Sequence, residues 1–114
     1  MPRLKVRFRQ EARTDLENIY LSVLKVSQNE KIALGFYNRI YERCKRIGFV
    51  PFGGRRRDDL EVGLRTVPFE HSAIIAYKVE SDRVDIANVF YGGRDYETFY
   101  LGALPDDGDF ETET

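Results

Sequence analysis

The sequence predicts an α+β fold in which an N-terminal α-helical hairpin packs on one face of a small antiparallel β-sheet. Apolar and basic residues alternate over residues 4–8, as in a half-buried strand. Apolar residues then recur at helical spacing from residue 11 to residue 47, with one interruption. Three strand-like runs follow between residues 64 and 91. The predicted order is β-α-α-β-β-β, in a single domain over residues 1–105.

The two helices are predicted from their apolar stripes and from the short segment between them. The first covers residues 11–26 and has no obvious N-cap, because Arg9 and Gln10 precede it. The "SQNE" segment at 27–30 predicts a capping box for the second helix, with Ser27 as the N-cap and Glu30 three residues later. Gly48 ends the second stripe. Both stripes are too wide to bury on each other alone, so we expect a sheet beneath the hairpin.

The C-terminal half is predicted to be a loop followed by a three-stranded meander. Residues 50–63, "VPFGGRRRDDLEVG", have the Gly, Pro and charge content of a loop. Strands are predicted at 64–69, 72–79 and 84–91, and Pro68 interrupts the first. The apolar run at 72–79 suits a strand that is covered on both faces.

The composition argues against several classes of protein. A single cysteine, Cys44, excludes an internal disulfide, and one cysteine with one histidine argues against a structural zinc site. No apolar run approaches the ~20 residues of a membrane span, and the first residues lack the apolar core of a secretory signal. We therefore expect a cytoplasmic protein with no metal, no cofactor and no membrane partner.

The charges are divided unevenly along the chain. Residues 1–57 hold 14 Lys/Arg and 5 Asp/Glu, whereas residues 58–114 have a net charge of −10. Five acids lie in residues 106–114, and residues 1–105 have a net charge of +4. We expect the acidic tail at 106–114 to be disordered, because it has too little apolar surface to order itself. Its default role is solubilising, and it is also able to compete electrostatically for basic surface.

Several segments in order resemble the RelE/ParE superfamily of bacterial toxins, and the ParE branch most closely. They are "EARTDLENIY" (11–20), "ALGFYNRIYERCKRI" (33–47), "PFGGRRRDDLEVGLR" (51–65) and "AYKVESDRVDIANVFYGGRD" (76–95). Together the resemblance covers residues 4–100. The sequence departs from the family where a histidine often precedes the glycine of the last motif, since Tyr91 stands there.

The resemblance implies the toxin of a type II toxin–antitoxin system, neutralised by a cognate antitoxin that is expected to carry a ribbon-helix-helix DNA-binding domain. ParE members poison DNA gyrase and have no recognised catalytic residues, so we expect inhibition by binding and not an enzyme. The alternative, from the RelE branch, is a ribosome-dependent mRNA endonuclease. A third reading is an inactive relative that only binds an antitoxin.

Five arginines are candidates for contact with the target: Arg55, Arg56, Arg57, Arg65 and Arg94. Arginine's planar fork suits bidentate contact with phosphate or carboxylate. The competing interpretation is structural, with Arg55–Arg57 in a solvated loop neutralised by nearby acids, and with Arg65 and Arg94 supporting the fold.

If the protein is an mRNase, the resemblance points to Arg65, Arg94 and Tyr100 as catalytic residues. Cleavage by the 2′-OH needs proton transfer and stabilisation of a dianionic phosphorane. A tyrosine is a poor base at neutral pH unless cations lower its pKa. In the competing interpretation Phe99 and Tyr100 pack the C-terminal segment onto the sheet.

The helices offer more aromatic surface than one face of a four-stranded sheet is expected to bury. The candidates for antitoxin contact are Leu16, Tyr20, Phe36, Tyr37 and Tyr41, of which we expect only a subset to be exposed.

Overall fold

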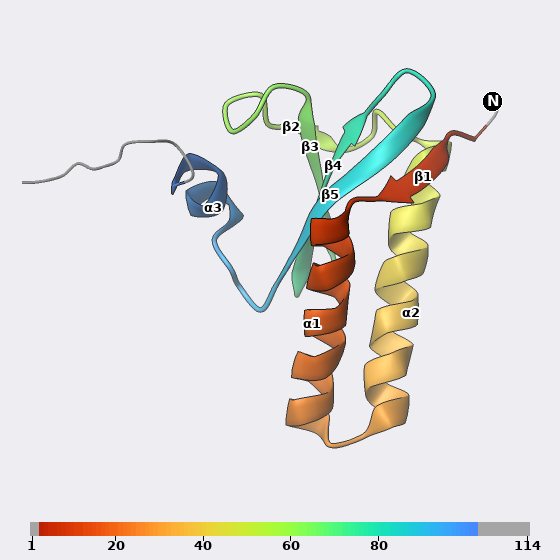
Figure 1. The fold of residues 1–114 in the computed structure, drawn as a ribbon, viewed down its shortest axis with the longest axis vertical. Helices are drawn as coiled ribbons and strands as arrows, with labels where there is room; N and C mark the ends of the chain where they lie inside the picture. The colour runs from red at the N-terminus through yellow and green to blue at the C-terminus, as the bar shows by residue number, and fades with distance from the viewer. Residues whose placement is uncertain (1–2, 103–114) are drawn as a thin grey trace, which may run out of the picture.

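The computed structural model describes residues 3–102, so the acidic segment at 106–114 lies outside the described residues. Within this range the α+β prediction is confirmed: a helical hairpin packs against one face of a five-stranded sheet (Figure 1). The elements in chain order are β1 (Lys5–Phe8), α1 (Gln10–Ser27), α2 (Glu30–Arg46), a 3-10 turn (Ile47–Phe49), β2 (Arg55–Arg56), β3 (Leu64–Phe69), β4 (Ala73–Val79), β5 (Arg83–Tyr91) and α3 (Tyr96–Gly102).

The sheet is mixed, which corrects the purely antiparallel prediction. Its strand order is β1-β5-β4-β3-β2, and β1 pairs in parallel with β5 while the other pairs are antiparallel. A parallel pair needs a long crossover, and the two helices between β1 and the meander supply it. The short strand β2 falls inside the predicted loop at 50–63.

The hairpin forms as predicted, but its cap is different. Asn29 is the N-cap of α2, and its side chain accepts hydrogen bonds from the backbone amides of Lys31 (2.9 Å) and Ile32 (3.2 Å). The predicted N-cap, Ser27, is instead the last residue of α1. The expectation that α1 lacks a side-chain cap is confirmed at Arg9.

The hairpin covers one face of the sheet, and α3 covers part of the other. The main core lies between the hairpin and the sheet, and residues such as Leu16, Ile40 and Ile86 are buried there. A smaller cluster on the opposite face contains Leu64, Ala76 and Phe90, with Tyr96 and Tyr100 of α3 packed against it. Helix α3 is thus folded back onto the sheet.

A β-bulge interrupts the pairing of β4 with β5. Asn88 pairs with Ala76 and Ile86 pairs with Tyr77, so Ala87 is the extra residue. Asn88 and Asp85 then both lie on the face that α3 partly covers, and the Asn88 side chain also donates a hydrogen bond to Asp15 of α1. None of the helices in residues 3–102 is sufficiently long and apolar to span a bilayer.

Candidate partner-binding and target-binding surfaces

An apolar groove runs between the two helices of the hairpin. It has a volume of about 350 Å³ and is lined by Glu17, Tyr20, Leu21, Leu34 and Tyr37. Leu21 and Leu34 are 57% and 52% exposed, which is high for leucine. Large apolar side chains exposed together mark a surface that fits an apolar partner segment.

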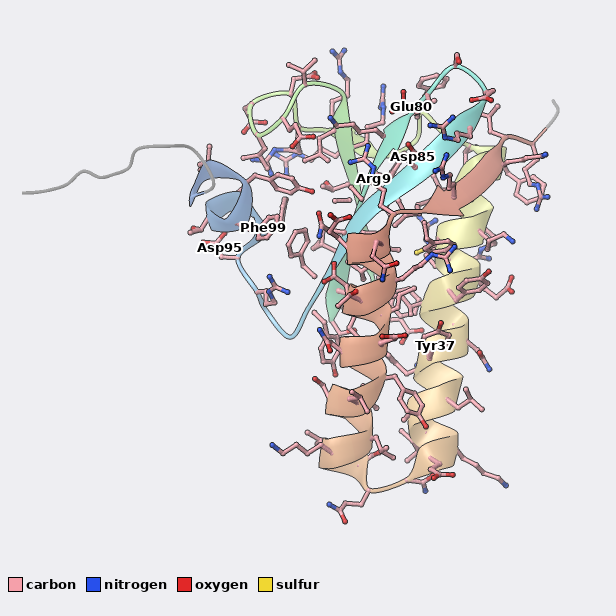
Figure 2. All side chains as sticks on the ribbon, viewed as in Figure 1. Arg9, Tyr37, Glu80, Asp85, Asp95 and Phe99 are labelled. Carbon is pink, nitrogen blue, oxygen red and sulfur yellow. The ribbon has the colours of Figure 1, made fainter. Side chains whose placement is uncertain are left out.

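The groove is lined in part by an aromatic chain that continues into the core. The rings of Tyr20 and Tyr37 meet edge to face, with centroids 6.4 Å apart. Tyr37 stacks on Tyr41 and Tyr41 stacks on Phe8, so the aromatic wall is anchored to β1. Figure 2 shows Tyr37 on α2, beside α1. This anchoring holds the aromatic wall of the groove in place.

The five predicted contact residues on the helices divide between core and surface. Leu16 is only 2% exposed and packs in the main core, so it is not available to a partner, which corrects its nomination. Phe36 is half-buried between Phe69 and Tyr91, with the guanidinium of Arg39 over its ring. Tyr20, Tyr37 and Tyr41 are half-buried.

The groove also contains Leu21 and Leu34, which sequence reasoning missed. Each lies just outside the apolar stripe that identified the core of its helix. Positions outside the apolar stripe of a helix are expected to face solvent. A leucine at such a position, beside a residue of the stripe, indicates that the apolar face of the helix is wider than the stripe.

The three consecutive arginines of β2 and the following loop have different environments. Arg55 is exposed, and Arg56 pairs with Asp58 at 2.8 Å on the surface. Arg57 is buried, and its guanidinium pairs with Asp59 at 2.9 Å and Glu97 at 2.7 Å and donates to the Tyr96 hydroxyl. The hydrogen bonds that Arg57 donates to the carboxylates of Asp59 and Glu97 raise its pKa. Arg57 therefore ties α3 to the loop, and it is a poor candidate for target contact.

Arg65 is engaged by the chain itself. Its guanidinium donates to the carbonyls of Phe52 (3.1 Å) and Gly54 (2.9 Å) and lies over the Phe52 ring. These bonds hold the segment that connects the 3-10 turn to β2 against β3, so the structural interpretation accounts for Arg65.

Arg94 follows the Gly92–Gly93 turn, where both residues have positive φ. Its guanidinium lies 5.2 Å from the centre of the Phe90 ring and 5.9 Å from that of Phe99. The register places Arg65 opposite Tyr77 and the end of β5 opposite Ala73, at the other end of β4. The two arginines are therefore at opposite ends of the sheet and do not act on one group.

Tyr100 lacks the environment of a general base. Its hydroxyl donates to Oδ1 of Asn88 at 3.3 Å, and its ring packs against Phe90. Burial, reinforced by the charge of Glu61, raises the pKa of Tyr100 to about 12, against the opposing effect of Arg9. A base for the 2′-OH needs a pKa shifted the other way. Residues 3–102 also contain no cluster of His, Cys, Asp and Glu suited to a metal ion.

Comparisons with known proteins agree with this geometry. Residues 6–96 match the family described as "ParE toxin of type II toxin-antitoxin system, parDE". Comparison with curated proteins gives no significant match.

Among solved structures, the chain is similar to one titled "Chromosomal ParDE TA system from P. aeruginosa". The TM-score is 0.68 at 22% identity, over 78% of this chain and 96% of that one. It is also similar to the toxin–antitoxin complex RelBE2 from Mycobacterium tuberculosis, with a TM-score of 0.54 at 18% identity, over 79% and 99% of the chains. Because both identities are low, these likenesses show the fold. The family match covers most of the chain, and the protein accordingly belongs to the ParE toxins of type II toxin–antitoxin systems.

Proposed function

We propose that this toxin inhibits DNA gyrase by binding it, and that a cognate antitoxin neutralises it by inserting an apolar segment into the hairpin groove. The observation that carries the proposal is the contrast between the two kinds of site. The groove between α1 and α2 is open and apolar, whereas the residues nominated for catalysis are separated or engaged in the fold. Inhibition by binding needs no general base.

The antitoxin part of the proposal rests on the shape and chemistry of the groove. Tyr20 and Tyr37 provide an aromatic wall, and Leu21 and Leu34 provide exposed aliphatic surface. An amphipathic helix docks its apolar face into grooves of this kind. The solved ParDE system and the RelBE2 complex are toxin–antitoxin systems with a similar fold, which supports an antitoxin as the partner.

The gyrase part of the proposal is tested by comparing two targets with one protein preparation. The purified chain is added to a gyrase supercoiling assay and to ribosomes translating a defined mRNA. We expect loss of supercoiling or trapped cleaved DNA, with intact mRNA. The Tyr100→Phe variant should inhibit as well as the parent. Ribosome-dependent cleavage that disappears in Tyr100→Phe would reject gyrase inhibition in favour of the endonuclease alternative.

The exposed cations Arg55 and Arg94 are the remaining candidates for the gyrase contact. The Arg55→Gln and Arg94→Gln variants should inhibit gyrase less than the parent does. The control variant is Lys31→Gln, which removes one positive charge at the exposed end of the hairpin and should inhibit as the parent does. If all three variants inhibit gyrase as strongly as the parent does, the surface that contacts gyrase does not include Arg55 or Arg94. A chain that affects neither gyrase nor mRNA but still binds its antitoxin would be the inactive relative.

A further inference from the structure

The sheet face opposite the hairpin is only partly covered, and its uncovered part is basic. The side chains of Val6 and Phe8 on β1 pack toward the main core. Since alternate residues of a strand point to opposite faces, Lys5 and Arg7 lie on the face away from the hairpin. Parallel pairing places them beside Arg83 and Asp85 of β5, respectively.

Two arginines at this place pair with a single buried carboxylate, and two further cations lie on the adjacent strand β1. The side chain of Asp85 is 9% exposed, and it pairs with Arg83 at 2.9 Å and with Arg9 at 3.9 Å. Figure 2 shows Arg9 close to Asp85 at the junction of β1 and α1. We call Lys5, Arg7, Arg9 and Arg83 the basic strip.

The basic strip has more positive charge than its own acids neutralise. Asp82 and Asp85 pair with Arg83, and the charge of Glu80 also acts on Arg83, which leaves the seven groups together at +1. Within residues 3–102, Lys5 and Arg7 make no ion pair, and both are exposed. An excess of unpaired cations on an open sheet face favours an anionic ligand.

Helix α3 brings the chain to this same face. The Tyr100 hydroxyl donates a hydrogen bond to Asn88. Asn88 and Asp85 are successive residues of β5 on the same face of the sheet, about 7 Å apart along the strand. Arg9 of the basic strip is near Tyr100, since the positive charge of Arg9 lowers the Tyr100 pKa and so counteracts part of the rise that burial causes. The helix ends at Gly102, and the sequence then continues for twelve residues.

Those twelve residues have the charge and the length to reach the basic strip. The segment contains no lysine or arginine, and its acids are Asp106, Asp107, Asp109, Glu111 and Glu113. A chain of twelve residues spans up to about 40 Å. The first of the acids is four residues beyond Gly102, and a short tether of this kind gives an effective concentration on the order of millimolar.

We propose that residues 106–114 act as an intramolecular acidic ligand of the basic strip, and so compete with anionic partners for this face of the sheet. The inference goes beyond gyrase inhibition and antitoxin binding, and its test requires neither. Binding through exposed charges is weakened by salt, so the contact is strong at low ionic strength and weak at high ionic strength.

The test uses a spin label at position 114, introduced by Thr114→Cys. Cys44 can stay, since it is fully buried and burial raises the pKa of its thiol to about 12, which makes it unreactive. Paramagnetic broadening of backbone amides is then recorded by NMR at about 10 mM and about 1 M salt, where the Debye lengths are ~30 Å and ~3 Å. Labelled protein mixed with unlabelled protein separates contacts within one chain from contacts between chains.

We expect the amides of Lys5, Arg7 and Arg83 to lose most of their intensity at low salt and to recover at high salt. The effect should disappear in Lys5→Gln/Arg7→Gln and persist in Lys25→Gln/Lys31→Gln, which removes the same charge at the far end of the hairpin. Neutralising the five tail acids should also abolish it. Broadening that is absent, spread over the surface, insensitive to salt, or unchanged in Lys5→Gln/Arg7→Gln would overturn the proposal.

Discussion

The carboxylate of Asp15 on α1 accepts a hydrogen bond from the backbone amide of Val89 at 2.9 Å. Val89 lies on β5, two residues after the bulge residue Ala87. The same oxygen accepts a bond from Nδ2 of Asn88 at 3.1 Å. Strand β1 pairs with β5 only as far as Ile86, so Val89 lies beyond the last residue that β1 covers, and a helix side chain supplies an acceptor for its amide there. Asn88 in turn accepts a hydrogen bond from the Tyr100 hydroxyl. Through Asn88, Asp15 therefore connects the hairpin with the sheet and α3.

Removing the Asp15 carboxylate is expected to destabilise the protein. In Asp15→Ala the Val89 amide loses its acceptor in a partly buried place, which should lower the free energy of unfolding by about 1–3 kcal/mol. Urea denaturation measures the change. Glu17→Gln, two residues along the same helix on an exposed position, should leave the midpoint unchanged. Equal stability of Asp15→Ala and the parent would show that water replaces the carboxylate at no cost.

Tyr77 and Gly54 are predicted to be coupled. The buried Tyr77 hydroxyl donates to the carbonyl of Pro51 at 2.8 Å and accepts from the Gly54 amide at 2.9 Å. Tyr77→Phe leaves both backbone groups without a partner, at a cost of about 1–3 kcal/mol. A Cβ at position 54 would collide with the Tyr77 hydroxyl, so Gly54→Ala also destabilises.

Tyr77→Phe removes the ring substituent that the new methyl meets most closely, although Cε1 and Cζ of the ring remain within 2.8 and 2.9 Å of it. The two substitutions also disturb the same hydrogen bond, so the double variant should lose less stability than the sum of the single losses. A double-mutant cycle by thermal or urea unfolding gives the coupling energy, expected to be on the order of 1 kcal/mol. Strict additivity would mean that the backbone at Gly54 moves away freely.

Stability is expected to fall at alkaline pH. Burial raises the pKa of Cys44 from 9.0 and that of Tyr100 from 10.0, each to about 12. The folded state therefore favours the neutral thiol and phenol. Their contribution is fully present below pH 9 and is lost as the pH rises toward 12, with a slope of up to about 1.4 kcal/mol per pH unit for each group.

Urea unfolding between pH 7 and pH 11 measures this loss. Tyr100→Phe should flatten the slope above pH 10, whereas Tyr20→Phe, on the hairpin surface, should not. If both variants keep the parent's slope, other groups govern the alkaline transition.

Arg57 is expected to control the local stability of α3. In Arg57→Met the helix loses the pairing of Glu97 and the hydrogen bond to Tyr96, while the aliphatic volume remains. Hydrogen exchange of the α3 amides should accelerate more than that of β4. Arg56→Gln removes the neighbouring exposed guanidinium and should leave α3 exchange unchanged. Uniform acceleration across the whole sheet would instead show that Arg57 supports the global fold.

The hairpin groove yields a prediction about antitoxin affinity. Leu21→Glu and Leu34→Glu place a charge in the apolar groove and should weaken antitoxin binding by tenfold or more, about 1.4 kcal/mol or greater. Val26→Glu makes the same change on α1 at a residue that is 86% exposed and outside the groove lining, so it should bind normally. Calorimetric titration compares the three. Normal binding by the two groove variants would place the antitoxin elsewhere.

The features predictable from the sequence were those governed by local periodicity. The helix stripes and the meander follow from residue spacing, so the hairpin and β3–β5 lie where they were expected. The parallel pairing of β1, the burial of Arg57 and the fold-back of α3 depend on contacts between residues distant in the chain. Ser27 and Asn29 are both good capping residues, and composition alone does not choose between them. Candidate sites were harder still, because an arginine's sequence neighbours do not reveal whether its charge is already paired.

The pairing of β1 with β5 bears on how the protein is made. The first strand of the chain is completed only by the last strand of the sheet. During synthesis the hairpin leaves the ribosome before β3, β4 and β5, the strands that cover its apolar stripe. The nascent chain therefore exposes the aromatic surface of the hairpin until β5 has been synthesised, and the sheet closes through contacts of high sequence separation, which form slowly. A partner that binds the hairpin is able to meet it in this interval, before the sheet exists.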